Sequence, residues 1–97
     1  MKLETQKINV IRKFESSAYQ RLSVKQVLAL FYLEDDDITT TALAKRVGVT
    51  SAAATGMIDR MVDRGLVVRN RNRSDRRVIT VQITDQGRGV VDRIVNS

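Results

Sequence analysis

The sequence predicts a single α+β domain, residues 1–97, that is mostly helical. Two observations predict this fold class. Apolar residues recur at helical spacing over most of the chain, whereas residues 77–83 alternate between apolar and polar with a period of two. A chain of 97 residues also has room for only one domain. We therefore expect four helices, then two strands, then a closing helix.

The first two helices are predicted from their apolar spacing and from a start signal. Leu3, Ile8, Ile11, Phe14 and Ala18 fall near helical spacing and predict a helix over residues 3–18. Ser23 and Gln26 match a capping box, in which each side chain bonds the backbone of the other, before a helix that runs to about Leu33. The acidic run 34–37 would oppose the dipole at that helix end, so we expect a loop there.

The next two helices are separated by a tight turn. Thr39 is a candidate N-cap for a short third helix, and Gly48 lies where a helix end favours positive φ. Thr50 or Ser51 would then cap a fourth helix over residues 51–64, which ends at Gly65. This spacing is typical of a helix-turn-helix, whose second helix enters the major groove of DNA.

A basic hairpin and a last helix follow. Residues 66–70 and 77–83 are the predicted strands, and the polar segment 71–76 is their turn. A short strand near Ile38 would complete a three-stranded sheet. Thr84 is the candidate N-cap of the final helix. A helix-turn-helix followed by such a hairpin, the wing, predicts a winged helix-turn-helix fold.

The positive charge is concentrated in one third of the chain. The net charge is +6, and residues 45–77 hold nine basic and three acidic residues, which account for the whole excess. A focused basic region is expected of a surface that binds phosphate groups. The other interpretation is a solvated basic face without a ligand.

Composition excludes several kinds of chemistry. The chain has no cysteine and no histidine. Disulfides, zinc sites built on these residues and imidazole catalysis are therefore excluded, and we expect no metal and no cofactor. No apolar run approaches the roughly 20 residues that span a bilayer, and the N-terminus lacks the apolar core of a signal peptide. We expect no membrane association.

The outer face of the fourth helix supplies the first group of candidate DNA contacts. Most of its side chains are small, which lets a helix backbone approach base edges closely, and its hydroxyls and methyls can reach phosphates and bases. The same face is also consistent with an unused surface. The candidates are Ser51, Ala52, Thr55, Gly56 and Arg60.

The hairpin supplies the second group. Arg71, Arg73, Arg76 and Arg77 lie within seven positions, and arginine on a thin ribbon can enter the minor groove or bind phosphates. Asp75 is expected to pair with a neighbouring arginine, most plausibly Arg77, and to brace the loop. The alternative is a solvated turn.

Four sequence runs resemble the MarR family of transcriptional regulators. They are Leu43-Ala-Lys-Arg-Val-Gly-Val-Thr50, Met57-Ile-Asp-Arg-Met-Val-Asp-Arg-Gly-Leu-Val67, Arg71-Asn-Arg-Ser-Asp-Arg-Arg77 and Ile83-Thr-Asp-Gln-Gly87. The resemblance covers about residues 22–93. It implies a homodimer on a pseudo-palindromic operator, and repression that a small phenolic or lipophilic ligand relieves. It also implies a cytoplasmic, nucleoid-associated protein of a bacterium or archaeon.

The resemblance assigns roles to individual residues. It maps Thr39, Thr50, Ser51 and Thr55 to DNA contacts, Arg73 and Arg76 to the wing, and Asp75 with Arg77 to its internal brace. Gly56 stands where the family often has arginine or another long polar residue. Only residues 3–18 and 84–97 are present to form the dimer interface and to line the family's ligand pocket. We therefore expect at most a small effector pocket.

The terminal helices carry the candidate dimer interface, and the same residues could equally form the core of one chain. They are Leu3, Ile8, Ile11, Val90, Val91, Ile94 and Val95.

The sequence thus predicts a double-stranded DNA-binding regulator, acting as a repressor. Three alternatives differ in their partner or chemistry. A winged helix could bind a protein through its terminal helices, or bind DNA as an architectural or excision-type factor. An enzyme would need groups that this composition lacks.

Overall fold

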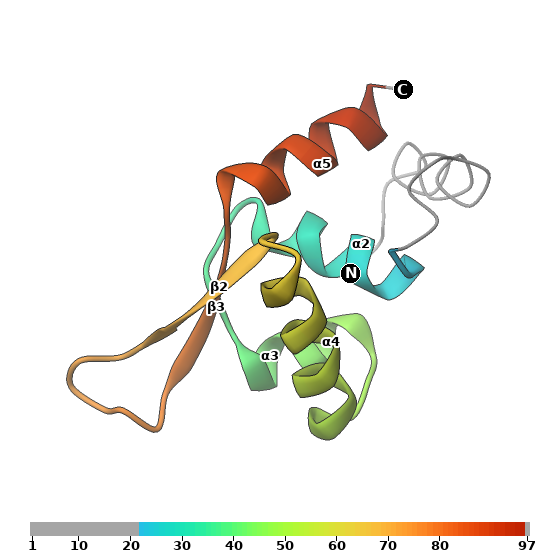
Figure 1. Ribbon diagram of the computed structural model, residues 1–97. Helices are drawn as coiled ribbons and strands as arrows, with labels where there is room; N and C mark the ends of the chain where they lie inside the picture. Colours follow the sequence, from blue (N-terminus) through green and yellow to red (C-terminus); the bar gives the residue numbers. More distant parts are fainter. Residues whose placement is uncertain (1–21, 97) are drawn as a thin grey trace.

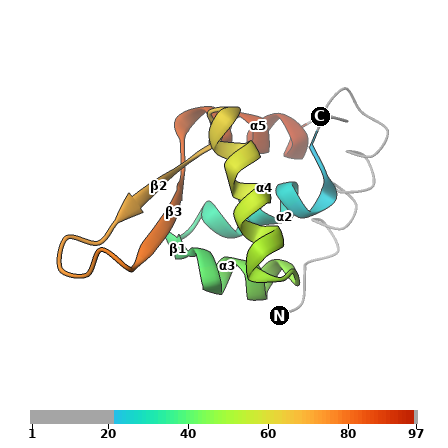
Figure 2. The ribbon, with the colours of Figure 1, turned by 60° about the horizontal axis from the view of Figure 1, so that its bottom comes forward.

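The structure is a computed structural model and describes residues 22–96. The helix predicted over residues 3–18 lies outside this range, as do Leu3, Ile8 and Ile11. The described residues form a winged helix-turn-helix, as predicted (Figures 1 and 2). Its elements in chain order are α2 (Val24–Leu33), β1 (Ile38–Thr39), α3 (Thr40–Val47), α4 (Ser51–Asp63), β2 (Val67–Arg71), β3 (Ile79–Ile83) and α5 (Asp85–Val95).

The helix starts follow the predicted caps. The Ser23 hydroxyl accepts from the Gln26 N–H, and the Gln26 amide oxygen accepts from the Ser23 N–H, which completes the capping box of α2. Thr39 and Thr84 cap α3 and α5 in the same way. Of the two candidates for α4, Thr50 is the N-cap. Each cap satisfies an N–H group that has no partner within its helix.

Two glycines end the helices of the helix-turn-helix. Gly48 has φ of +82° after α3, and Gly65 has φ of +74° after α4. The turn after Gly48 is closed by the Val49 N–H, which donates to the Ala44 carbonyl at 3.0 Å. The Leu66 N–H likewise donates to the Met61 carbonyl at 3.0 Å. This bond holds Leu66 in the helix end, so β2 begins at Val67 and not at Leu66.

The three strands form one antiparallel sheet in the order β1-β3-β2, so the short strand expected near Ile38 is present. Ile38 pairs with Val81, and Val81 pairs with Arg69 on the other side. The predicted start of the second strand at Arg77 is wrong. The Val78 N–H donates to the Asp75 carbonyl at 3.0 Å, which keeps residues 77 and 78 in the wing loop, and β3 starts at Ile79.

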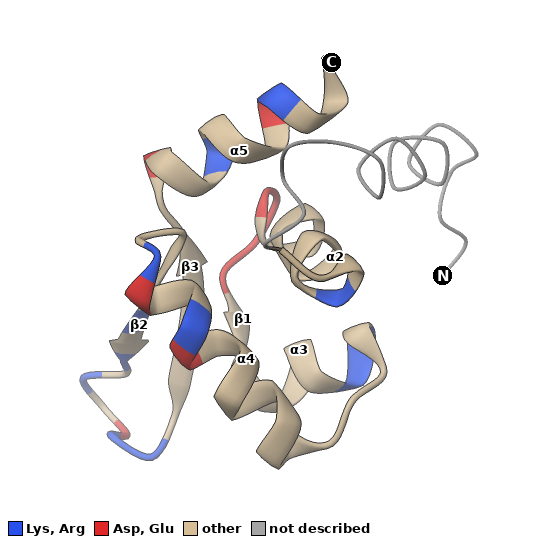
Figure 3. Cartoon of the chain, turned by 45° about the vertical axis from the view of Figure 1, so that its right-hand side comes forward, with Lys and Arg blue, Asp and Glu red and all other residues tan. Residues whose placement is uncertain are grey.

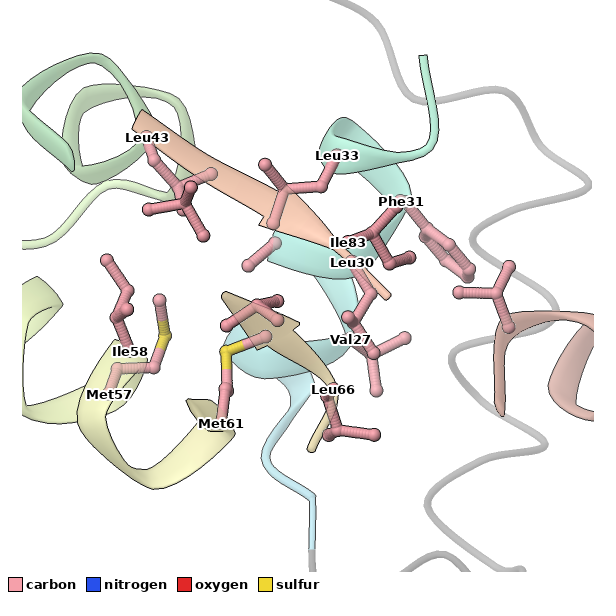
Figure 4. Packing of buried hydrophobic residues seen from close by; sticks show 14 of the residues in the cluster. Val27, Leu30, Phe31, Leu33, Leu43, Met57, Ile58, Met61, Leu66 and Ile83 are labelled. Atoms are coloured by element: carbon pink, nitrogen blue, oxygen red, sulfur yellow. The ribbon is translucent and has the colours of Figure 1, made fainter. Parts of the chain in front are cut away.

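The core lies between α2, α3, α4, the sheet and α5 (Figure 4). Leu30, Leu43, Ile58, Met61 and Val81 are among its fully buried side chains. Burial of these apolar groups fixes the rotation of α4 about its axis. The opposite face of α4 is therefore turned outward.

The last helix contributes to the same core. Val90, Val91 and Ile94 are buried within the chain, as the core interpretation predicted, whereas Val95 is 39% exposed. Among residues 22–96, no helix combines the length and the apolarity needed to cross a membrane.

Candidate nucleic-acid interface

The first turns of α4 are exposed because the core begins beyond them. Ser51, Ala52 and Thr55 are exposed, and Gly56 is half-buried. Ala53 is exposed as well and is absent from the predicted contacts. The first buried residue of the helix is Ala54. The N-terminal end of α4 thus projects from the body of the domain.

Three hydroxyls predicted to contact DNA already have partners inside the protein. Thr39 accepts from the Ala42 N–H at 3.2 Å, and Thr50 accepts from the Ala53 N–H at 3.1 Å. The Thr55 hydroxyl donates to the Ser51 carbonyl one turn earlier at 3.0 Å. The Thr55 hydroxyl has thus used its only proton, whereas the Thr39 and Thr50 hydroxyls each keep a proton to donate.

Arg60 lies apart from the other candidates. It lines a hollow of about 410 Å³ beside the start of α2, together with Ser23, Gln26, Asp63 and Arg64. Its guanidinium folds back along the helix, and its Nη1 is 3.8 Å from where a Cβ on Gly56 would lie. The structure therefore groups Arg60 with α2 and not with the wing.

The wing loop is braced from within by the predicted pair. The Asp75 carboxylate accepts from the Arg77 N–H and Nε–H at 3.0 Å each, and from its Nη2 at 3.1 Å. The Arg77 guanidinium holds the pKa of Asp75 below its usual range, and Asp75 raises the pKa of Arg77. Arg77 is thus occupied by the loop itself.

Two further braces were not predicted from the sequence. The Asn72 amide oxygen accepts from the N–H groups of Ser74 and Asp75, at 2.8 and 3.1 Å, which is an Asx-type turn. Arg71 Nη1 donates to the Arg76 carbonyl at 2.9 Å and spans the base of the loop. Asparagine at the start of a polar turn was the available signal. Arg71 has this structural bond through one guanidinium nitrogen, and its DNA contact stays a prediction.

Arg73 and Arg76 are the two other arginines of the wing loop. Both side chains are exposed, and neither has a hydrogen bond or an ion pair with any residue between 22 and 96. Because the hydrogen bonds of the wing fix the loop, the guanidinium groups of Arg73 and Arg76 are exposed on a hairpin of defined shape.

An ion pair joins the wing to α4. Arg69, on β2, donates to the Asp59 carboxylate at 2.6 Å and to the Thr55 carbonyl at 3.3 Å. Both Asp59 and Arg69 border a groove of about 550 Å³ between α4, the start of α3 and the base of the wing. Neither residue was predicted for the site, because the contact depends on how β2 packs beside α4.

The basic wing and the start of α4 lie toward the same end of the described structure. Basic residues are spread over the wing, whereas the acidic run 34–37 lies on the loop between α2 and β1 (Figure 3). In Figure 1 the tip of the wing and the start of α4 both lie toward the bottom, and α5 lies at the top.

Residues 22–96 contain no cluster of acidic side chains able to hold a metal ion.

A sequence model of the MarR family matches residues 22–79, which is more than half of the chain. The chain belongs to the MarR family. The match spans α2 to the start of β3, and so covers the helix-turn-helix and the wing. The resemblance stated from the sequence motifs is confirmed.

Similar family members are known from bacteria. The chain is 37% identical over 76 residues to an uncharacterized HTH-type transcriptional regulator, YdgJ, of Bacillus subtilis, and 32% identical over 71 residues to the repressor YetL of the same organism. These matches cover 78% and 73% of this chain, but only 46% and 42% of those proteins. The chain thus spans less than half the length of these relatives.

A solved family structure contains DNA. The transcriptional repressor CouR, bound to a 23-mer DNA duplex, is 28% identical to this chain and superposes with a TM-score of 0.76. The superposition covers 91% of this chain and 63% of that one.

Proposed function

We propose that this chain is a sequence-specific, double-stranded DNA-binding transcriptional regulator that acts as a repressor. The observation that carries the proposal is the pair of exposed arginines, Arg73 and Arg76, which have no side-chain partner among residues 22–96 and lie on a wing joined to α4 by the Arg69–Asp59 ion pair. We assign α4 to the major groove and wing residues 71–77 to the minor groove and the backbone.

The relatives support this proposal. YetL is named a repressor, and CouR is a repressor seen on a DNA duplex. The family consists of transcriptional regulators, which favours a regulator over an enzyme. A cytoplasmic location fits this role.

We assign the proposed contacts to two kinds. Arg73 and Arg76 can bind phosphates, which supplies affinity that falls as salt rises. Ser51, Ala52 and Thr55 are positioned to approach bases, which supplies sequence preference. Arg60 stays a predicted contact, although it lies on the α2 side of the helix. Release by a small phenolic or lipophilic ligand likewise stays a prediction.

Binding to a pool of labelled duplexes of about 30 base pairs tests the proposal, since that length accommodates two half-sites. We expect affinity to fall steeply with salt. For Arg73→Ala/Arg76→Ala, affinity falls and the slope of log K against log salt becomes shallower by about 2 for each bound chain, the value for two lost phosphate contacts per chain.

The charge-matched control is Arg88→Ala/Arg93→Ala on α5, which removes the same charge from two other exposed arginines. Because Arg88 donates to the Glu34 carbonyl at 3.1 Å and Arg93 to the Gly89 carbonyl at 3.3 Å, thermal unfolding checks that this variant keeps its fold. Its salt slope should equal that of the wild type. Equal effects of the two double variants would show that only net charge matters. No binding by the folded wild type at low salt would overturn the proposal and direct attention to a protein partner.

A further inference from the structure

Thr55 differs from an ordinary DNA-contacting threonine because its hydroxyl proton is already used. The residue is exposed in the second turn of α4 and borders the groove beside the wing. Its hydroxyl donates to the Ser51 carbonyl at 3.0 Å, and a hydroxyl has only one proton to donate. The γ-methyl is the other substituent on Cβ, and the bond to Ser51 fixes its direction by fixing χ1.

The polar groups next to Thr55 are also occupied. The Thr55 carbonyl accepts from Arg69 at 3.3 Å, and the same guanidinium binds Asp59 at 2.6 Å. Asp59, one turn after Thr55 on the same face of α4, is therefore held to β2 by an ion pair. It would have to break that ion pair to reach a base. Gly56, beside Thr55, has no side chain. This part of α4 can offer the γ-methyl of Thr55 to the DNA. The Thr55 hydroxyl proton is used, Gly56 has no side chain, and the Asp59 carboxylate is an acceptor already bound by Arg69.

Of the groups exposed in the major groove, the C5 methyl of thymine is the one that an apolar side chain recognises. Resting on the proposed function, we propose that Thr55 is a specificity-determining residue that contacts the C5 methyl of a thymine in each half-site through its own γ-methyl. The partner is then a duplex with a thymine at that position, where cytosine is disfavoured because it lacks the methyl.

Two conservative changes separate the methyl from the hydroxyl. Thr55→Val keeps the γ-methyl and loses the hydroxyl, whereas Thr55→Ser keeps the hydroxyl and loses the methyl. On the duplex that repeated rounds of binding enrich from the pool, we expect Thr55→Val to bind like the wild type. Thr55→Ser should lose about fourfold in affinity for each half-site, the effect of removing one buried methyl group per bound chain. Thermal unfolding of each variant checks that α4 is intact.

The DNA partner can be changed in a matched way. Deoxyuridine differs from thymidine only by the missing C5 methyl, so each thymine of the half-site is replaced in turn. We expect one replacement to lower the affinity of the wild type by about fourfold. The same replacement should have little further effect on Thr55→Ser, because the two changes remove the same contact.

The outcomes separate this inference from the proposed function. Salt-dependent binding in which no deoxyuridine position couples to Thr55→Ser would overturn the inference and leave the proposed function standing. A loss of affinity for Thr55→Val together with wild-type affinity for Thr55→Ser would also overturn it, and would assign the contact to the hydroxyl oxygen as an acceptor. Absence of binding to every duplex would overturn both.

Discussion

At the scale of single residues, the main finding is that many predicted DNA contacts have a structural bond of their own. Thr39 and Thr50 cap helices, and Arg71 bonds the Arg76 carbonyl. A sequence shows that a hydroxyl or guanidinium lies near a helix start or a turn. The sequence does not show which neighbouring backbone group will form a hydrogen bond with that side chain, because the bond depends on the rotamer that the fold sets.

The brace between Asp75 and Arg77 should persist across the physiological pH range. Arg77 lowers the pKa of Asp75 from its ordinary value of 3.8, so the pair contributes fully above that value and is lost only as pH falls through the lower, folded-state pKa. We expect the Arg77 Nε–H signal in NMR to be unchanged between pH 7 and pH 5. A shift of that signal within this interval would contradict the assignment.

Removal of the brace should affect DNA binding more than folding. Asp75→Ala frees a loop that must then be ordered on the duplex, so we expect roughly a twofold to tenfold loss of affinity. The midpoint of thermal unfolding should barely change, because the pair is exposed. Asp75→Asn, which keeps an acceptor, serves as the intermediate control. A large drop in the unfolding midpoint would indicate a wider structural role.

At the scale of elements, packing decides what each helix face tolerates. Gly56 lies inside α4 and Gly87 lies inside α5, and the sequence alone does not show which of the two positions has room for a side chain. Around Gly56 a Cβ would meet only Arg60 Nη1 at 3.8 Å. At Gly87 it would collide with the Leu66 carbonyl oxygen and approach Ile83 Cγ1 to 2.7 Å. Gly87 is thus the point where α5 packs tightly against the end of α4 and the sheet.

The two glycines should respond to alanine with opposite signs. Gly56→Ala should raise the free energy of unfolding by about 0.5–1 kcal/mol, because alanine favours the helix. Gly87→Ala should lower it by about 1–3 kcal/mol or more, because the backbone must shift. Urea denaturation measures both. A neutral effect of Gly87→Ala would show that α5 can move away without loss.

At the scale of the whole molecule, the wing and the exposed start of α4 lie toward one end, and α5 lies at the other (Figure 1). In the proposed function, one such domain covers a single half-site. Two copies on a full site would then need their recognition helices about one helical turn of DNA apart. Val95 is the residue of the candidate dimer interface on α5 that is exposed in the single chain.

We accordingly expect two chains on each enriched duplex of about 30 base pairs. Sedimentation velocity of the chain with a labelled duplex gives the stoichiometry, and a duplex cut to one half-site is the control. Two chains on the full site and one on the half-site would agree with the prediction. A single chain on the full site would contradict it.

For residues 22–96, the sequence by itself determined the order of elements, the helix caps, the glycine helix ends and the basic wing with its Asp75–Arg77 brace. Those features depend on interactions between residues a few positions apart, which local spacing reveals. The short partner strand at Ile38 was also within reach of the pattern.

Only the tertiary structure decided which candidate residues are free. The packing of β2 beside α4 brings Arg69 to Asp59 and Thr55, ten and fourteen positions away. Burial of the inner face of α4 turns Arg60 toward α2 and leaves Ala53 in solvent. These outcomes depend on how separate elements meet in space, and that geometry is set by the whole core and not by any single segment.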